Sequence, residues 1–209
     1  GGNCQVEFNH TGQGPSFPLQ FSANLEVTAH MVDRSVEYPP WLRRMELNYD
    51  FEQRRAKVVI REGLDAGKTY LRLYDAKREY MIREGDFPVC RRSYLGEDMP
   101  QPGIPRTSVF QGMVIIDGVK CEHWLQDDGT SRVHIFYDHE NQVPRRLTEE
   151  ATPWDSEPVP MMTYDFMGVV IGQQSVSVFD LPESYTHKDC EIHVGGFPYL
   201  HLFHHYMVV

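Results

Sequence analysis

Residues 45–82 read MELNYDFEQRRAKVVIREGLDAGKTYLRLYDAKREYMI, and this stretch decides the fold class. Apolar side chains alternate with polar ones from Met45 to Phe51 and again from Ala56 to Ile60, on either side of the polar turn 52–54. Two shorter runs, 70–74 and 78–82, follow around the turn 75–77. A period of two places successive side chains on opposite faces of a strand. The pattern therefore predicts an antiparallel meander with one apolar and one charged face.

The same alternation extends in both directions along the chain. Apolar residues recur at every second position from Phe21 to Met31. Residues 112–125 predict a hairpin around Asp117-Gly118, because Asp-Gly suits a tight two-residue turn. Further strands are expected at 133–137, 143–149, 162–170 and 175–179, and an irregular loop at 85–106, which holds four of the prolines. About ten or eleven short strands with frequent turns predict an all-β sheet, curled or closed, with little helix.

Composition narrows the classes of function. The chain has 209 residues, a formal net charge of −10, 41% hydrophobic and 12% aromatic residues. This is enough apolar material for a sizeable core, and the size suits one large β domain. The acidic balance argues against nucleic acid as a partner and against docking on anionic lipid. No stretch approaches the roughly 20 apolar residues of a membrane-spanning helix.

Cysteine usage and a glycosylation pattern predict a secreted or endolysosomal protein. Asn9-His10-Thr11 fits the acceptor sequence for N-glycosylation at Asn9. The four cysteines, an even and dispersed set, suggest disulfides in an oxidising compartment. They permit three pairings, and the sequence leaves the choice open. Their positions favour Cys90–Cys121, which would pin the loop between them, and Cys4–Cys190, which would join the terminal arms.

No recognisable catalytic motif is present. The sequence has no Gly-x-Ser-x-Gly elbow, no Gly-rich phosphate loop and no papain-type sequence around a cysteine. We therefore expect no catalytic residues in this chain and no cofactor.

Two groups of residues are candidates for metal binding. Cys121-x-His123 with Cys190-x-x-His193 could supply zinc ligands, and so could His201, His204 and His205. Neither group has the spacing of a zinc finger, and disulfides would consume the thiolates. We expect no metal site.

The last residues form the most unusual segment. From Phe197 onward the chain is almost entirely apolar, aromatic or His. Such a segment packs back on the domain or is covered by a partner. The sequence thus predicts an extended arm at 1–18, a β domain at 19–190 and a tail at 191–209. The expected docking residues of the tail are Phe197, Tyr199, Leu202, Phe203 and Tyr206.

A series of short motifs resembles a known family. The motifs are Cys90, Cys121-x-x-Trp124, Phe136-Tyr137, Val143-Pro144-Arg145, Tyr164-Asp165-Phe166, Phe179-Asp180-Leu181-Pro182, Cys190 and Gly196-Phe197-Pro198. In this order, over about residues 40–205, they are similar to the N-terminal non-catalytic domain of certain papain-like cysteine proteases. Those are the two-chain cathepsin-like proteinases of insects and the counting-factor-associated proteins of amoebae. Their domains resemble the lipoprotein carrier LolA, which implies a strongly curved antiparallel sheet like an unclosed barrel.

Three functions follow as hypotheses. The resemblance implies a regulatory light chain or prodomain that associates with a papain-like protease chain through the tail. The curved sheet suggests a carrier for a lipid or other apolar ligand in its concave face, where Met113, Met161, Met162 and Met167 would suit an adaptable pocket, although methionine fills ordinary cores equally well. The third hypothesis is an extracellular structural or adhesion protein. An enzyme acting alone is not expected.

Overall fold

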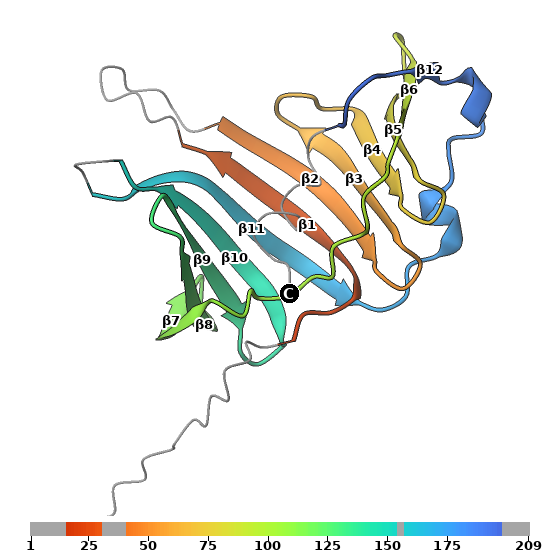
Figure 1. Cartoon of the computed structure of the whole chain (residues 1–209). Helices are drawn as coiled ribbons and strands as arrows, with labels where there is room; N and C mark the ends of the chain where they lie inside the picture. Colours follow the sequence, from red (N-terminus) through yellow and green to blue (C-terminus); the bar gives the residue numbers. More distant parts are fainter. Residues whose placement is uncertain (1–15, 31–40, 154–156, 198–209) are drawn as a thin grey trace, which may run out of the picture.

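The computed structural model describes residues 16–30, 41–153 and 157–197 (Figure 1). In these ranges the chain forms twelve strands and two short 3-10 helices, with no α-helix. The elements are β1 (Gln20–Ala29), β2 (Trp41–Asp50), β3 (Arg55–Glu62), β4 (Lys68–Leu73), β5 (Arg78–Arg83), β6 (Val89–Tyr94), β7 (Val109–Ile116), β8 (Val119–Asp127), β9 (Ser131–Asp138), β10 (Val143–Ala151), β11 (Val159–Ile171), η1 (Val176–Phe179), η2 (His187–Asp189) and β12 (Glu191–Ile192).

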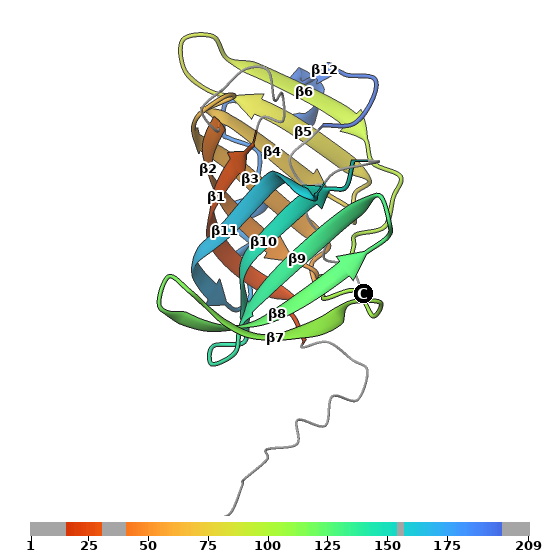
Figure 2. The ribbon, with the colours of Figure 1, turned by 90° about the vertical axis from the view of Figure 1, so that its left-hand side faces the viewer.

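One sheet contains all twelve strands, in the order β12-β6-β5-β4-β3-β2-β1-β11-β10-β9-β8-β7. Neighbouring strands are antiparallel, except that β12 runs parallel to β6. Figures 1 and 2 show that the sheet curves strongly, so that its two ends bend toward the same side. The edge strands β7 and β12 do not pair with each other, and the sheet stays open. The predicted fold class, mainly β with a strongly curved, unclosed antiparallel sheet, is confirmed.

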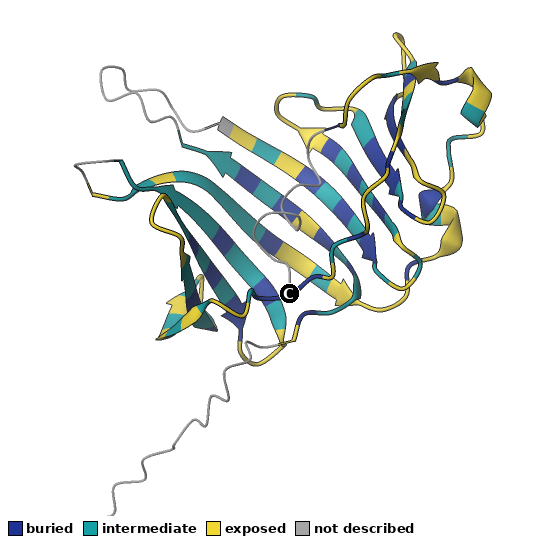
Figure 3. Cartoon of the chain, in the orientation of Figure 1, coloured by how far each residue is buried: buried dark blue, intermediate teal, exposed yellow. Residues whose placement is uncertain are grey.

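The main core lies on the concave face of the sheet. Burial alternates along β1, where Phe21, Ala23, Leu25 and Val27 are buried and the residues between them are more exposed (Figure 3). Equivalent residues of the other central strands, from Met45 in β2 to Phe166 in β11, join the same cluster. The predicted alternation therefore builds one continuous apolar face.

The segment between β6 and β7 crosses the open side of this concave face (Figures 1 and 2). It contributes Leu95, Met99 and Ile104 to the main core. The hydroxyl of Tyr49 donates a hydrogen bond to the carbonyl oxygen of Pro100, which fixes the segment to β2. Residues that the sequence marks only as a proline-rich loop thus cover part of the core.

A smaller core lies on the convex face. Leu71, Tyr80 and Ile82 point away from the main core and pack with Phe179 of η1 and with Cys90 and Cys190. The chain between β11 and β12 therefore runs over the back of β4, β5 and β6.

Two local predictions were wrong. Residues 89–94, expected to be irregular, form β6, because Ile82 and its neighbours in β5 offer a strand to pair with. Residues 176–179, expected to be a strand, form η1, whose Phe179 fills the smaller core. The Asp117-Gly118 hairpin is confirmed, with φ of 47° and 80° at the two turn residues.

Candidate functional site

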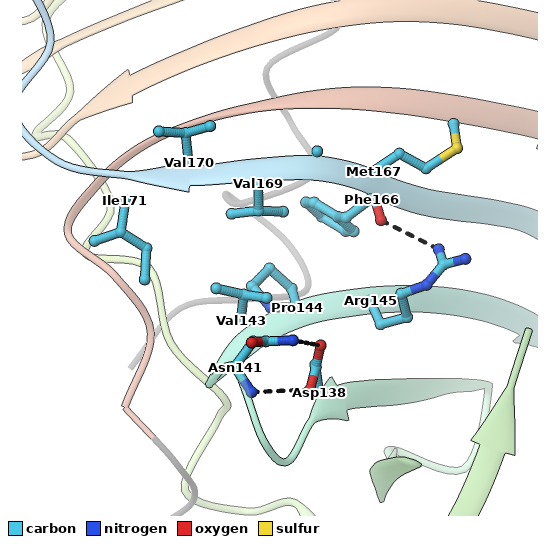
Figure 4. Close-up of a pocket in the computed structure, with 11 residues that line it drawn as sticks. Asp138, Asn141, Val143, Pro144, Arg145, Phe166, Met167, Val169, Val170 and Ile171 are labelled. Atoms are coloured by element: carbon cyan, nitrogen blue, oxygen red, sulfur yellow. Dashed lines mark hydrogen bonds between the residues drawn. The ribbon is translucent and has the colours of Figure 1, made fainter. Parts of the chain in front are cut away.

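Two neighbouring strands of the sheet separate partway along their length. β10 and β11 are paired from Arg146↔Asp165 to Ala151↔Val159. Beyond the Arg146↔Asp165 pair, β10 stays paired with β9, and β11 stays paired with β1, but β10 and β11 are no longer paired with each other. Residues 143–145 and 166–171 therefore face one another across an opening, which we call the β10–β11 cleft (Figure 4).

The local sequence explains why the strands separate there. Pro144 has no N–H to donate to a neighbouring strand, and the β9–β10 register shifts between Pro144 and Arg146. The β1–β11 register also shifts, between Ser22 and Asn24, where Gly168 has a φ of 57°. A bulge bends its strand and interrupts regular pairing. Irregularities in both strands thus turn their ends apart.

The walls of the β10–β11 cleft combine apolar side chains with polar groups in nearly equal share. Its volume is about 650 Å3, which is within the range of small-molecule sites. Phe166 belongs to the main core and Val169 packs against it, whereas Met167, Val170 and Ile171 are exposed. The cleft therefore connects solvent with the apolar concave face. Its lining consists of Asp138, Asn141, Val143, Pro144, Arg145, Phe166, Met167, Gly168, Val169, Val170 and Ile171.

The polar groups at the cleft already have partners. Arg145 donates to the carbonyl oxygen of Phe166 at 3.1 Å and to Asp117 at 3.0 Å (Figure 4). Asp138 accepts hydrogen bonds from the backbone and the side-chain amide of Asn141, at 3.0 and 2.9 Å. These hydrogen bonds and ion pairs compensate the charges at the cleft, so its apolar residues supply the contacts that are not already engaged within the protein.

Tyrosines on the concave side remain neutral at physiological pH. Burial raises the pKa of Tyr164 to about 12, with a further contribution from the carboxylate of Glu149. Burial also raises the pKa of Tyr137, whose hydroxyl donates to the carbonyl oxygen of Ser16 at 2.8 Å. The face behind the cleft therefore carries no phenolate charge.

The disulfide pairing differs from the predicted one. Cys90 is bonded to Cys190, and Cys121 is a buried free thiol. The pairs Cys90–Cys121 and Cys4–Cys190 are therefore wrong, because β12 returns beside β6 and brings Cys190 to Cys90, whereas Cys121 lies in β8 near the opposite edge of the sheet. Cys4 and the sequon at Asn9 lie outside the described residues.

The described part of the predicted tail packs on the domain. Phe197 is buried in the main core, so it is not available to dock a partner, contrary to prediction. Arg72 and Glu79, both buried, hold this segment: the Phe197 N–H donates to Glu79 at 3.0 Å, and Arg72 donates to the Phe197 carbonyl oxygen at 3.3 Å. Arg72 also lies 3.1 Å from Glu79. Tyr199, Leu202, Phe203 and Tyr206, like His201, His204 and His205, lie outside the described residues.

Histidines form a second polar cluster, on the convex face. His123 Nε2 lies 2.7 Å from His134 Nδ1, and His134 Nε2 lies 2.9 Å from the carboxylate of Glu150. Burial and the neighbouring His134 lower the pKa of His123. Within the described ranges, no group of three or more His, Cys, Asp or Glu residues is arranged to hold a metal ion. Cys190, considered above as a zinc ligand, forms the disulfide with Cys90 and therefore has no thiolate to bind a metal.

Sequence reasoning missed the β10–β11 cleft, although two signals mark it. Pro144 lies inside a strand pattern, and Gly168 interrupts another. Of the four methionines considered for a pocket, Met167 lines the cleft, Met162 packs against the main core and Met113 is exposed on β7. In the part of the chain that the structure describes, no helix is long and apolar enough to cross a membrane.

Comparisons with known proteins give structural likeness alone. No protein-family model matches the sequence, and the search of curated proteins gives no match. An uncharacterized conserved protein from Thermus thermophilus has a similar structure, with a TM-score of 0.53 at 7% identity. The alignment covers 84% of this chain and 90% of that protein. At such low identity the likeness shows the fold alone.

A LolA superfamily protein from Nitrosomonas europaea is also similar, with a TM-score of 0.37 at 12% identity over 79% of this chain and 92% of that one. This TM-score is too low to support an argument. Neither protein is described as a cysteine protease or as a part of one.

Proposed function

We propose that this chain is a non-catalytic protein that binds an apolar ligand, such as a lipid acyl chain, in the β10–β11 cleft. The observation that carries the proposal is the separation of β10 from β11, which opens a cleft of about 650 Å3. Seven apolar residues line it, namely Val143, Pro144, Phe166, Met167, Val169, Val170 and Ile171. Mostly apolar, largely preformed cavities of this size are typical of small-molecule sites.

The exposed apolar residues of the cleft support this function. The side chains of Val170 and Ile171 have exposed fractions of 63% and 57%. Each contacts water over most of its surface, which costs about 25 cal/mol per Å2 of apolar area left unburied. A ligand that lies across both removes this area from water. Phe166 and Val169 extend the same surface inward to the main core.

The chemistry of the cleft favours holding a ligand over transforming it. Arg145 and Asp138, the charged residues of the lining, are engaged in hydrogen bonds with their own neighbours. A binding protein needs few polar groups, whereas a catalyst needs a base or nucleophile with a free reactive atom. The buried Cys90–Cys190 disulfide supports the predicted oxidising compartment. Association with a papain-like protease stays a prediction, because no comparison and no described contact bears on it.

The test measures binding of cis-parinaric acid, a fluorescent fatty acid, to wild-type protein and to charge-insertion variants. Met167→Glu and Val170→Glu place a carboxylate in the cleft, where an acyl chain would desolvate it. Two matched controls lie outside the cleft. Met113→Glu matches Met167→Glu, because both methionines have an exposed fraction of 38%. Val176→Glu matches Val170→Glu, because the two valines have exposed fractions of 61% and 63%.

We expect the dissociation constant to rise at least about tenfold in the two cleft variants, since desolvating a carboxylate costs more than the roughly 1.4 kcal/mol that corresponds to tenfold. The two controls should bind like wild type. Absence of saturable binding, or equal losses in Met113→Glu and Val176→Glu, would refute the proposal.

A further inference from the structure

A second pocket lies on the convex side of the sheet, far from the β10–β11 cleft. It is formed where β5 and β6 meet η2 and β12, and its volume is about 460 Å3. We call it the Arg78–Arg92 pocket. Its lining consists of Ala76, Lys77, Arg78, Arg92, Ser93, Tyr94, His187 and Ile192.

The strand register places the two arginines on one face. Arg78 pairs with Tyr94, and Arg92 pairs with Tyr80, in the antiparallel β5–β6 ladder. Tyr80 belongs to the smaller, convex core, so these alternate positions all face the convex side. The hydroxyl of Tyr80 lies 2.7 Å from Nδ1 of His187, which holds η2 over the same face.

The disulfide joins the two walls of the pocket. Cys90 lies in β6, two residues before Arg92, and Cys190 lies between His187 and Ile192 in the chain. The bond therefore fixes the segment that carries His187 and Ile192 against the strand that carries Arg92.

Three of the eight lining residues are Lys or Arg, none is a carboxylate, and the accessible surface of the pocket is mostly apolar. Among the described residues, Lys77, Arg78 and Arg92 have no acidic group within ion-pair distance. The same holds for other cations of the sheet, such as Lys57, Arg83, Arg91 and Lys120, whereas eight Lys and Arg residues are paired. Those paired residues are Arg44, Arg55, Arg61, Lys68, Arg72, Arg132, Arg145 and Arg146. In a chain of net charge −10, the pocket is thus a local region of positive charge.

Three of the acidic residues next to the pocket in the sequence are engaged elsewhere, and the fourth, Glu191, is exposed on β12 and is not part of the lining. Asp75 pairs with Arg55 at 3.0 Å, and Glu79 faces the concave side, where it meets Arg72. Asp189 accepts hydrogen bonds at the start of its own 3-10 helix. None of these carboxylates therefore neutralises Arg78 or Arg92.

Two further observations concern the charged groups of the pocket. Nε of Arg92 is buried and has no hydrogen-bond acceptor among the described residues, which is costly for a charged donor. Burial lowers the pKa of His187, and the positive charges of Arg78 and Arg92 lower it further. A negatively charged group in the pocket would offset the positive charge around His187, whereas the buried Nε of Arg92 has no surface that such a group could contact.

We propose that the Arg78–Arg92 pocket binds the phosphate group of a phosphate monoester whose organic part lies on Tyr94 and Ile192. The two guanidinium groups and Lys77 supply charge-assisted donors, and guanidinium geometry suits phosphate oxygens. Tyr94 and Ile192, both largely exposed, supply an apolar rim for the organic part. The phosphate belongs either to a small soluble ester or to a lipid headgroup.

The test uses phenyl phosphate as the soluble probe, titrated into the full chain by calorimetry. Arg78→Gln and Arg92→Gln each remove one guanidinium group. Arg78 is the exposed first residue of β5, so we expect its replacement to leave the fold intact. Arg61→Gln is the matched control, because Arg61 is an exposed arginine on β3 that is already paired with Glu46 at 2.8 Å. The three variants change the net charge equally.

We expect the dissociation constant for phenyl phosphate to rise about tenfold or more in Arg78→Gln and in Arg92→Gln, and to stay unchanged in Arg61→Gln. Equal weakening in all three would show general electrostatic attraction and overturn the proposal. Absence of binding to both phenyl phosphate and vesicles would also overturn it.

Vesicles distinguish the two sources of the phosphate. Phosphatidylcholine vesicles with and without phosphatidic acid are tested by co-sedimentation with wild type and Arg78→Gln. Binding that requires phosphatidic acid and is lost in Arg78→Gln assigns the phosphate to a lipid headgroup. Binding of phenyl phosphate without vesicle binding assigns it to a soluble ester.

Discussion

The disulfide between β6 and the segment before β12 gives the sharpest test of the chain's topology. Cys90 and Cys190 are separated by 100 residues in the sequence. Closing a loop of this length removes about 4.7 kcal/mol of conformational freedom from the unfolded chain at 25 °C, by the loop-entropy relation. Both sulfurs are also buried in the smaller core. The double variant Cys90→Ala/Cys190→Ala should therefore lose about 4–5 kcal/mol, a large part of the stability of an ordinary domain.

Urea unfolding followed by tryptophan fluorescence measures this loss. With a slope near 2 kcal/mol per molar urea, the midpoint should fall by about 2 M. Reduced wild type should resemble the double variant, and dithiothreitol should leave the double variant unchanged.

Cys121→Ala is the control, because Cys121 is a free thiol outside the bond. This variant should keep its full sensitivity to dithiothreitol. The reasoning fails if Cys121→Ala abolishes that sensitivity, or if peptide mapping of unreduced protein finds Cys90 joined to Cys121. It also fails if the double variant unfolds at the midpoint of oxidised wild type.

Two buried polar groups give further predictions. Asp50 is fully buried, and although burial raises its pKa, hydrogen bonds from Gln53, Gln20 and the Gln174 N–H bring it below the ordinary value of 3.8. A carboxyl group whose pKa is lower in the folded than in the unfolded protein stabilises the fold at pH values above its unfolded pKa. This stabilisation is lost as the pH falls through the pKa of the folded protein. Asp50→Asn should therefore cost about 2–3 kcal/mol at pH 7 and progressively less in acid. Urea unfolding from pH 7 to pH 2.5 measures the difference, and a cost independent of pH would contradict the assignment. Arg72→Met should cost about 3–5 kcal/mol because it leaves the buried carboxylate of Glu79 without its cation. The double variant Arg72→Met/Glu79→Leu should recover much of this loss in the same assay, and no recovery would mean that the two charges are not coupled.

The alternating pattern predicted most of the strands and the antiparallel kind of sheet, but missed β6 and placed a strand where η1 forms. The alternation at Phe21–Val27 and Met45–Ile60 is a local property, because the period of two fixes which side chains share a face before any pairing exists. Turn residues such as Asp117-Gly118 carry their backbone preference with them. These features were enough to predict an antiparallel sheet, curled or closed, with an apolar face, whereas the strongly curved and unclosed form was an implication of the family resemblance.

Contacts between residues far apart in the sequence could not be predicted from local patterns. Cys190 reaches Cys90 because the chain crosses the convex face and adds β12 beside β6, and no local pattern encodes that return. The β10–β11 cleft forms because the pairing of β10 with β9 and the pairing of β11 with β1 are both irregular next to the cleft. The Arg78–Arg92 pocket forms because η2 folds over β5 and β6. Pairing partners are chosen by the whole sheet, because each contact between distant segments depends on the placement of every strand between them.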